Sequence, residues 1–312
     1  MPTCILCSSE NIETIDNISV EDLNRVYLKE YGIDIREDVK SDMTLEHCQI
    51  CNLKWFNPLY PAQAKFYSEL QKFDWYYKAE KFEYKFVGDF IKRTPDLRDA
   101  SRILEVGCGV GSFSTYVDAE FTGLEFNPTA CEEAQKLGRD VQCKSIEEAS
   151  KDNSLSYDIV CSFQVLEHVV NPKQFIESCV SVLKPGGALI LTTPSEDAWL
   201  QYKQDFALNL PPHHVTRWGE KTFRLLNKII PEIDLVYALD EPLDDFHIPW
   251  YLNAMITHQI NKRLGVKYSV IKQNQHRISH LVANVLTKII GKDLPSAFHG
   301  PGHTKIAVFS KH

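Results

Sequence analysis

The segment Ile103–Phe113, which reads ILEVGCGVGSF, constrains the fold of this chain more than any other stretch. A short apolar run ends in three glycines at alternate positions, Gly107, Gly109 and Gly111, and a stretch with helical spacing follows. This order predicts a strand, a tight turn and a helix. Glycine tolerates positive φ and lets a ligand lie against bare backbone at the start of a helix. We therefore predict a cofactor-binding loop in an α/β sheet.

An acidic residue follows at the spacing expected for nucleotide binding. Glu125 lies twenty residues after Glu105, at the end of a second apolar run. An acid at the tip of the second strand is where ribose hydroxyls are held. A dinucleotide fingerprint has two residues between its second and third glycines, whereas one residue separates Gly109 from Gly111. The spacing thus favours an adenosine-containing cofactor other than NAD.

Composition limits the partners of the chain. At 312 residues the length suggests about two domains, and the 44% hydrophobic content is ordinary for a globular protein. The net charge of −8 disfavours nucleic acid as the main partner, because that contact needs a basic surface. No run reaches the roughly 18 apolar residues of a membrane span, and the N-terminus lacks a signal-peptide pattern. We expect a cytoplasmic protein with reduced thiols and no transmembrane segment.

Four cysteines near the N-terminus form two matched pairs, Cys4-x-x-Cys7 and Cys48-x-x-Cys51. Each pair presents two thiolates on one side of a turn, and two such turns complete a tetrahedral zinc site. A redox pair or coincidence is the alternative, but no βαβ pattern surrounds either pair. Because four sulfur ligands leave no open position, we predict a structural Zn²⁺. The forty residues between the pairs must then form a small structure of their own.

The chain beyond Glu125 keeps alternating between strand and helix patterns. Further apolar runs read as strands at residues 157–163, 188–194, 232–241 and 303–312, and residues 139–147 read as a third strand with its exit loop. The sequence Lys184-Pro-Gly-Gly predicts a turn before the fifth strand. This order predicts a parallel sheet with helices on both faces and ligand sites at the carboxyl ends of the strands.

Three of these features together resemble a known family. The E-x-G-x-G-x-G pattern that starts at Glu105, the sequence Leu166-Glu167-His168 after the fourth strand and the Lys184-Pro-Gly-Gly turn are typical of class I S-adenosylmethionine (SAM) methyltransferases. The cysteine pairs and the aromatic residues that follow them resemble a bacterial group with an N-terminal zinc module. Members of that group are often associated with sugar or surface-glycan modification.

The resemblance implies a Rossmann-like, seven-stranded sheet with an antiparallel last strand, and SAM as the cofactor. The residues that it places at the cofactor are Glu105, Gly107, Cys108, Gly109, Gly111, Glu125, Phe126, Ser145, Ile146, Phe163, Gln164 and Tyr77. Glu105 would help to hold the methionine amino group of SAM. Ser145 and Ile146 would border its adenine.

Two adjacent histidines are the leading candidates for catalysis. His213 and His214 follow a Pro-Pro pair after the fifth strand, and His168 follows the fourth. Methyl transfer to a hydroxyl mainly needs positioning and removal of the hydroxyl proton. A histidine, with an ordinary pKa of about 6.5, suits that removal at neutral pH. The alternative is that the pair only orders its loop.

We divide the chain into five parts. These are a zinc-binding module (1–60), a helical connector (61–100), the SAM-binding core (101–242), a mainly helical insertion (243–302) and the final core strand (303–312). The insertion replaces what is normally a short hairpin between strands six and seven. A lid, an acceptor-binding element and a homodimer interface are the roles we consider for it, with a membrane-surface role less favoured.

The sequence thus predicts a SAM-dependent methyltransferase that O-methylates a sugar hydroxyl of a nucleotide sugar or glycan intermediate. C-methylation of a nucleotide-linked keto-sugar and O-methylation of a phenolic or quinone-like small molecule are the nearest variants. A non-catalytic protein that keeps the SAM fold is the alternative of a different class. It predicts decay of the glycine loop or loss of polar residues at the site, and the sequence shows neither.

Overall fold

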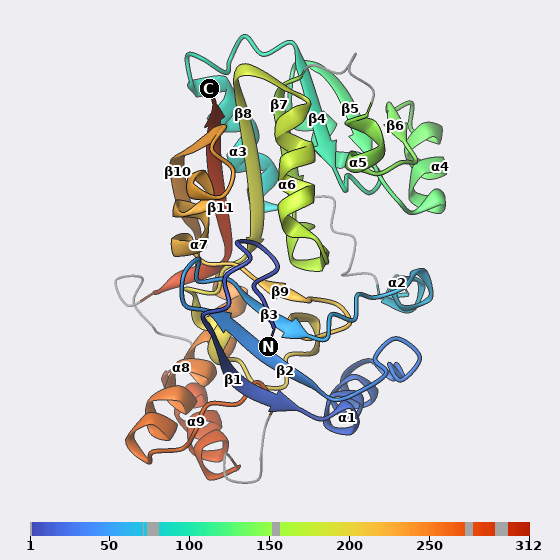
Figure 1. Ribbon diagram of the computed structural model, residues 1–312. Coiled ribbons are helices and arrows are strands. Elements are labelled where there is room, and N and C mark those ends of the chain that lie inside the picture. The colour runs from blue at the N-terminus through green and yellow to red at the C-terminus, as the bar shows by residue number, and fades with distance from the viewer. Residues whose placement is uncertain (1, 71, 74–80, 152–156, 272–276, 291–298) are drawn as a thin grey trace.

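A seven-stranded sheet forms the upper part of the molecule in Figure 1. The computed structural model describes residues 2–70, 72–73, 81–151, 157–271, 277–290 and 299–312. In spatial order the strands are β10 (Ile233–Pro242), β11 (Pro301–Lys311), β8 (Leu183–Pro194), β7 (Tyr157–Phe163), β4 (Arg102–Val106), β5 (Glu120–Leu124) and β6 (Val141–Gln142). β11 runs antiparallel to both of its neighbours, and the remaining pairs are parallel. The predicted mostly parallel sheet is confirmed.

Two strands differ from their predicted extents. The third parallel strand is only Val141–Gln142, because it is an edge strand that pairs through Gly123 and Leu124 alone. The Lys184-Pro-Gly-Gly turn lies inside β8. Tyr157 pairs with Leu183 and Ile159 pairs with Ala188. Residues 184–187, which lie between these partners, therefore bulge out of the register, and Gly186 has a φ of 78°.

Helices cover both faces of the sheet. On one face, α3 (Phe82–Arg93) buries Tyr84, Val87 and Ile91 against the apolar side chains of β4 and β7. On the other, α6 (Pro172–Ser181) and the short α5 (Ile146–Ala149) pack against Leu104 and Val106 of β4. α4 (Pro128–Lys136) follows β5. Alternate residues of β4 thus face opposite layers, as expected for a strand buried on both sides.

A second, four-stranded sheet lies below the carboxyl ends of the parallel strands (Figure 1). It consists of β1 (Ile12–Ile18), β2 (Met43–Cys48), β3 (Lys54–Asn57) and β9 (Thr216–Arg217), all antiparallel. α1 (Val20–Tyr31) begins at Ser19, whose side chain accepts from the N–H of Asp22, and ends at Gly32 in the left-handed region. α2 (Ala64–Leu70) follows β3. Because β9 comes from the chain after β8, the N-terminal part and the large sheet are joined by strand pairing.

An ion pair strengthens this junction. Lys54 of β3 contacts the Glu196 carboxylate at 2.5 Å, and both side chains are largely buried. Arg217, which pairs with Lys54 in the strand register, lies 3.9 Å from the same carboxylate.

Two α-helices lie among the described residues between β10 and β11. They are α8 (Ile248–Arg263) and α9 (Arg277–Ile290), and they pack beside the small sheet in Figure 1. α7 (Glu220–Arg224) precedes β10. Within the described part of the chain, no helix has the length and apolar character needed to cross a membrane.

Candidate active site

A cleft of about 1680 Å³ opens at the carboxyl ends of the parallel strands. The loops after β4, β5, β6 and β7 form one side of its lining. Tyr31, Ala62 and Tyr67 come to it from the N-terminal part, and Phe246 and Trp250 from the segment before and within α8. The cleft is thus built by all the main parts of the chain, at the edge where ligands bind in α/β sheets.

The glycine loop begins this lining. Gly107 has a φ of 72°, and an added Cβ would lie 2.4 Å from a methyl of Val165. Only glycine fits there, because the backbone has a positive φ and there is no room for a Cβ. The N–H groups of Gly107 and Cys108 donate to the carbonyl oxygen of Leu124 at 2.8 and 3.0 Å. These bonds hold the loop against the end of β5.

Glu125 joins this loop to the next one. Its carboxylate accepts from the N–H of Gly109 at 2.8 Å, and also from the N–H groups of Phe126 and Asn127 at 2.8 and 2.9 Å. The side chain is half-buried and lines the cleft. Phe126 beside it is 72% exposed, which leaves its ring available to a flat ligand.

Ser145, Ile146, Phe163 and Gln164 line the same cleft. Ser145 caps α5: its hydroxyl accepts from the N–H of Glu148, whose carboxylate accepts from the N–H of Ser145. Gln164 has a φ of 57° directly after β7. Its side-chain nitrogen is buried and donates to no described residue, so a polar ligand in the cleft would satisfy it.

Three of the residues that the sequence predicted at the cofactor are buried. Two of them do not line the cleft, and the third lines it with almost no exposed surface. Glu105 is fully buried and does not line the cleft; burial raises the pKa of its carboxyl well above the ordinary value. Gly111, with a φ of 72°, starts the turn Ser112–Tyr116 and also lies outside the lining. Cys108 lines the cleft but is 2% exposed, and burial raises the pKa of its thiol, so the thiol is not a nucleophile. Tyr77 lies outside the described residues.

His168, His213 and His214 converge on the cleft. Their ring centroids lie 4.5–4.9 Å apart, although 45 residues of sequence separate His168 from His213. Backbone bonds bring the two segments together: the N–H of Val215 donates to the carbonyl oxygen of Glu167 at 2.9 Å.

Burial governs the protonation of this cluster. It raises the pKa of Glu167 to about 8 and lowers the pKa of His168 to about 4. Burial also lowers the pKa of His213 and His214 well below the ordinary value, and the neighbouring rings add to that effect. The three imidazoles are therefore neutral near pH 7 and retain the ability to accept a proton or to bind a cation.

The four N-terminal cysteines form a separate cluster. Their sulfur atoms all lie within 4.8 Å of one another, with Cys4 and Cys51 at 3.5 Å and Cys7 and Cys48 at 3.5 Å. A tetrahedral zinc with Zn–S bonds of about 2.3 Å separates its ligands by about 3.8 Å, so the donor set fits. Both turns close alike, with a left-handed residue after the second cysteine: Ser8 at φ 60° and Asn52 at φ 68°.

Sequence reasoning missed several residues of the cleft. His303 contacts the Glu241 carboxylate at 2.7 Å, and both line the cleft from β10 and β11. Tyr67 lies with its hydroxyl 3.3 Å from Nδ1 of His168. The aromatic pair at 66–67 was a signal for Tyr67, but the His303 pairing depends on strand register and had no local signal.

Comparisons with known proteins agree with this architecture. Residues 79–228 match a family model described as a methyltransferase domain. The chain is 32% identical over 122 residues to the ubiquinone biosynthesis O-methyltransferase of Idiomarina loihiensis, which covers 36% of this chain and 50% of that protein. It is 30% identical over 143 residues to the protein of the same name from Coxiella burnetii, covering 38% and 61%.

A solved structure shows the same fold over almost the whole chain. The plantazolicin methyltransferase BamL, in complex with triazolic desmethylPZN analog and SAH, aligns with a TM-score of 0.50 and 11% identity over 94% of this chain and 96% of that chain. The chain spans about half of the length of the curated relatives that it matches.

Proposed function

We propose that this chain, which carries a class I SAM-dependent methyltransferase domain, transfers the methyl group of SAM to a hydroxyl group of a small-molecule acceptor. The observation that carries the proposal is the single cleft that joins the Gly107 loop and Glu125 to the histidine cluster. A glycine loop suited to a cofactor and histidines that could accept a proton thus line the same cleft, which supports methyl transfer to a hydroxyl.

The residues present fit SAM. The left-handed Gly107 leaves bare backbone at the loop, Glu125 stands where ribose hydroxyls are bound, and the side-chain nitrogen of Gln164 is buried without a described acceptor. Phe126, Ser145 and Ile146 would border the adenine. When bound, SAM supplies a methyl group on a sulfonium that is already a good leaving group.

The chain's own contribution is then to orient the acceptor and to take up its proton. His213 and His214 are our candidates for the proton acceptor, with His168 as the third. Burial keeps these rings neutral, and the carboxyl group of Glu167 lies 3.8 Å from Nε2 of both His168 and His214. A ring that gains a proton would favour the ionised form of this carboxyl group and would then be stabilised by its charge.

The charged residues of the cleft limit the kinds of acceptor that it can bind. Its described lining carries the carboxyl groups of Glu83, Glu125, Glu147, Glu167, Glu241, Asp244 and Asp245, although burial raises the pKa of Glu83 and raises that of Glu167 to about 8. Besides its histidines, of which His303 has a raised pKa, the basic residues of that lining are Lys81 and Lys144, with no arginine among the described positions. A diphosphate would meet repulsion here, so the nucleotide sugar predicted from the sequence is the less favoured acceptor. A sugar hydroxyl of an uncharged glycan intermediate stays a prediction.

The apolar part of the lining favours an aromatic or quinone-like acceptor. Tyr67, Phe206, Phe246 and Trp250 line the cleft around the histidines and the start of α8. Such rings bind flat, apolar molecules. The ubiquinone O-methyltransferases that the chain resembles support an acceptor of this class, a phenol, as our first choice.

We also propose that Cys4, Cys7, Cys48 and Cys51 hold a structural Zn²⁺. The cluster lies against the core of the large sheet, next to Leu6 and Leu53. A zinc here would fix the N-terminal sheet, and α2, which follows β3 of that sheet, supplies Tyr67 to the cleft. It would not take part in the transfer, because four sulfur ligands leave no position for a substrate.

The insertion contributes to the acceptor side through its first turns. Leu243, His247 and Trp250 line the cleft, which supports an acceptor-binding role for this end of α8. α9 presents exposed apolar residues on its outer side, including Ile278, Leu281 and Ile289. A homodimer through this helix stays a prediction, which light scattering of the purified protein tests.

Two measurements test the proposed function. Calorimetry should show saturable binding of SAM and of S-adenosylhomocysteine, and none of NAD. Mass spectrometry should then detect the gain of one methylene group when the protein and SAM are incubated with phenols, catechols, free sugars and nucleotide sugars. Absence of SAM binding would refute the proposal. Methylation of the nucleotide sugars alone would refute our choice of acceptor.

A further inference from the structure

The histidine cluster is arranged more like a ligand set than like a single base. One ring nitrogen from each of His168, His213 and His214 lies within 4.8 Å of the other two. The rings come from two different loops, after β7 and after β8, that the backbone holds together. A single proton acceptor does not require three converging imidazoles.

Hydrogen bonds orient the rings. Nδ1 of His168 donates to the carbonyl oxygen of His213 at 2.5 Å, and Nδ1 of His213 donates to the carbonyl oxygen of Leu208 at 2.9 Å. Nδ1 of His214 lies 3.3 Å from the side-chain oxygen of Asn209. An oxygen of this kind only accepts, so Nδ1 carries the hydrogen and Nε2 carries the lone pair. Histidines that bind metals show this same pattern, with the second ring nitrogen bonded to an oxygen.

Glu167 supplies an independent observation. Its side chain is 1% exposed, and its two oxygens accept no hydrogen bond from another described residue. Oε1 lies 3.8 Å from Nε2 of His168 and 3.8 Å from Nε2 of His214. A buried carboxyl group without partners is costly unless something else pairs with it. A cation held between this oxygen and the imidazoles would provide that pairing.

We propose that Glu167, His168, His213 and His214 form a binding site for a divalent transition-metal cation inside the cleft. Three imidazole nitrogens and one carboxylate oxygen suit Zn²⁺, Co²⁺ or Fe²⁺ better than Mg²⁺ or Ca²⁺, which prefer oxygen alone. Zn–N bonds of about 2.0–2.1 Å separate tetrahedral ligands by about 3.4 Å. Because the three ring nitrogens lie within 4.8 Å of one another, the cation would draw them together by up to about 1.4 Å.

This site differs from the cysteine cluster in chemistry and position. It offers nitrogen and oxygen in the cleft, whereas the other offers four sulfur atoms at the N-terminal sheet. Binding of the cation does not depend on the proposed function. Its consequence for the reaction does rest on it: the acceptor oxygen would take the place of Glu167 on the cation, which would lower the pKa of the acceptor hydroxyl, and the freed carboxylate would take up the proton while the histidines stay ligands.

Cobalt titration of the full-length protein, purified with its cysteine zinc in place, tests the site. We expect one further equivalent of Co²⁺ to bind saturably and to give weak visible bands. No strong near-ultraviolet thiolate-to-cobalt band should accompany them, because no sulfur is a ligand. A titration without a saturable further equivalent, or one with a strong thiolate band, would overturn the proposal.

Variants assign the ligands. Glu167→Gln and a His213→Ala/His214→Ala double variant should lose the added cobalt, with the double variant weakened most. His258→Ala should bind cobalt normally, because His258 stacks on Tyr202 at 3.8 Å outside the cluster. Each variant is first checked for a cooperative thermal transition, and Glu167→Gln, close in shape to the native residue, covers the case in which the double variant does not fold. Cobalt binding that persists in a folded Glu167→Gln protein and in a folded double variant contradicts the assignment.

Binding of S-adenosylhomocysteine by the same preparations separates the two proposals. If that ligand binds and cobalt does not, the metal site is wrong while the proposed function stands. If cobalt binds and S-adenosylhomocysteine does not, the proposed function is wrong while the metal site stands.

Discussion

The carboxylate of Glu125 accepts a hydrogen bond from the backbone N–H of Gly109 at 2.8 Å. This bond joins the loop after β5 to the loop after β4, so the acid that we assign to the ribose also fixes the glycine loop. Loss of the carboxylate would act on the cofactor both directly and through the loop.

We therefore expect Glu125→Ala to weaken SAM binding by about tenfold to hundredfold, since a hydrogen bond to a charged group contributes about 1.5–3 kcal/mol. Calorimetry with S-adenosylhomocysteine measures this loss of affinity. Glu120→Ala is the matched control, because Glu120 begins the same strand and its exposed side chain is far from the loop. Equal affinities for the Glu125→Ala and native proteins would show that the ribose is held elsewhere.

Gly107 allows a test of the loop itself. Gly107 and Gly138 both have left-handed φ values, 72° and 73°, but an added Cβ meets Val165 at 2.4 Å only at Gly107. Alanine at Gly138 should cost about 1–2 kcal/mol for the backbone alone. At Gly107 the crowding should add about 1–3 kcal/mol and reduce SAM affinity. Urea unfolding of both variants measures the difference, and equal losses would mean that Val165 moves aside freely.

The zinc proposal predicts a selective loss of metal. Cys48→Ser should remove one equivalent of zinc per chain and lower the melting temperature, because the binding free energy of a structural zinc contributes to folding. Cys143→Ser should keep its zinc and its melting temperature, since Cys143 is exposed and outside the cluster. Elemental analysis and calorimetry check this. Full zinc content in Cys48→Ser would contradict the four-thiolate site.

The parts of this structure that could be predicted from sequence are those with local causes. The strand and turn at Ile103–Phe113 follow from an apolar run that ends in glycines, and Glu125 follows from its spacing. The cysteine pairs are also a local signal, and their sulfur atoms meet as expected. Each of these features depends on residues that are close in sequence.

The features that could not be predicted from sequence depend on contacts between residues that are distant in sequence. β9 has two residues, too few for a propensity signal, yet its pairing with β3 joins the two sheets. The sequence showed Glu167 only as part of the Leu166-Glu167-His168 pattern, and its place beside two histidines needed the loop after β8. The short third strand likewise reflects its edge position more than its own sequence.

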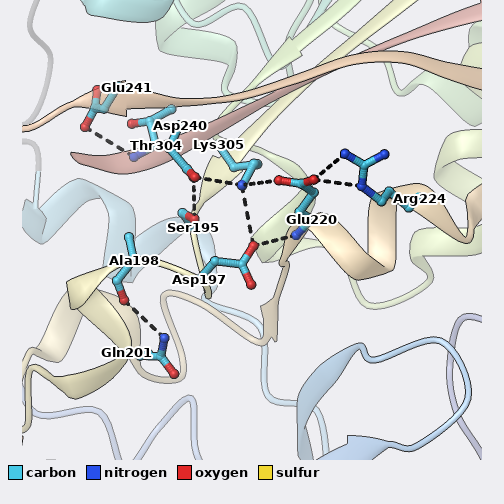
Figure 2. Close-up of polar contacts among 10 residues, drawn as sticks. All are labelled: Ser195, Asp197, Ala198, Gln201, Glu220, Arg224, Asp240, Glu241, Thr304 and Lys305. Carbon is cyan, nitrogen blue, oxygen red and sulfur yellow. Dashed lines mark hydrogen bonds and ion pairs between the residues drawn. The ribbon is translucent and has the colours of Figure 1, made fainter. Parts of the chain in front are cut away.

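A buried lysine of the large sheet provides a stability test. Lys305 of β11 is 1% exposed and reaches Asp240 at 2.8 Å, Glu220 at 3.3 Å and Asp197 at 3.5 Å (Figure 2). Lys305→Ala would leave these carboxylates facing one another without the lysine that all three share, and only Glu220 would keep a cationic partner among the described residues. We expect it to lower the free energy of unfolding by about 3–5 kcal/mol.

Arg224→Ala is the control for Lys305. Arg224 pairs with the same Glu220 but on the exposed side of the network, so its loss should change stability little (Figure 2). Urea unfolding followed by circular dichroism compares the two. Similar losses for both variants would mean that solvent screens the buried lysine as effectively as the exposed arginine.

The Glu241–His303 pair in the cleft predicts a pH dependence. Burial opposes both charges, but the facing partner outweighs it, so the pKa of Glu241 is lowered and the pKa of His303 is raised, with Glu83 and Asp244 also favouring the charged ring. The contribution of Glu241 is present above the unfolded pKa of about 4.3 and is lost as pH falls through its native pKa. The contribution of His303 is present below the unfolded pKa of about 6.5 and is lost as pH rises through its native pKa.

The pair should thus stabilise the protein most between about pH 4.3 and pH 6.5. The free energy of unfolding of the native protein should exceed that of His303→Gln by the largest amount in this window, and the excess should shrink towards pH 9. His312→Gln is the control, because the ion pair of His312 with Asp234 is more than half exposed and therefore screened. Urea unfolding at half-unit steps of pH measures both. An excess that grows above pH 7 would show that His303 is neutral in the native cleft and that Glu241 stands there without a cationic partner.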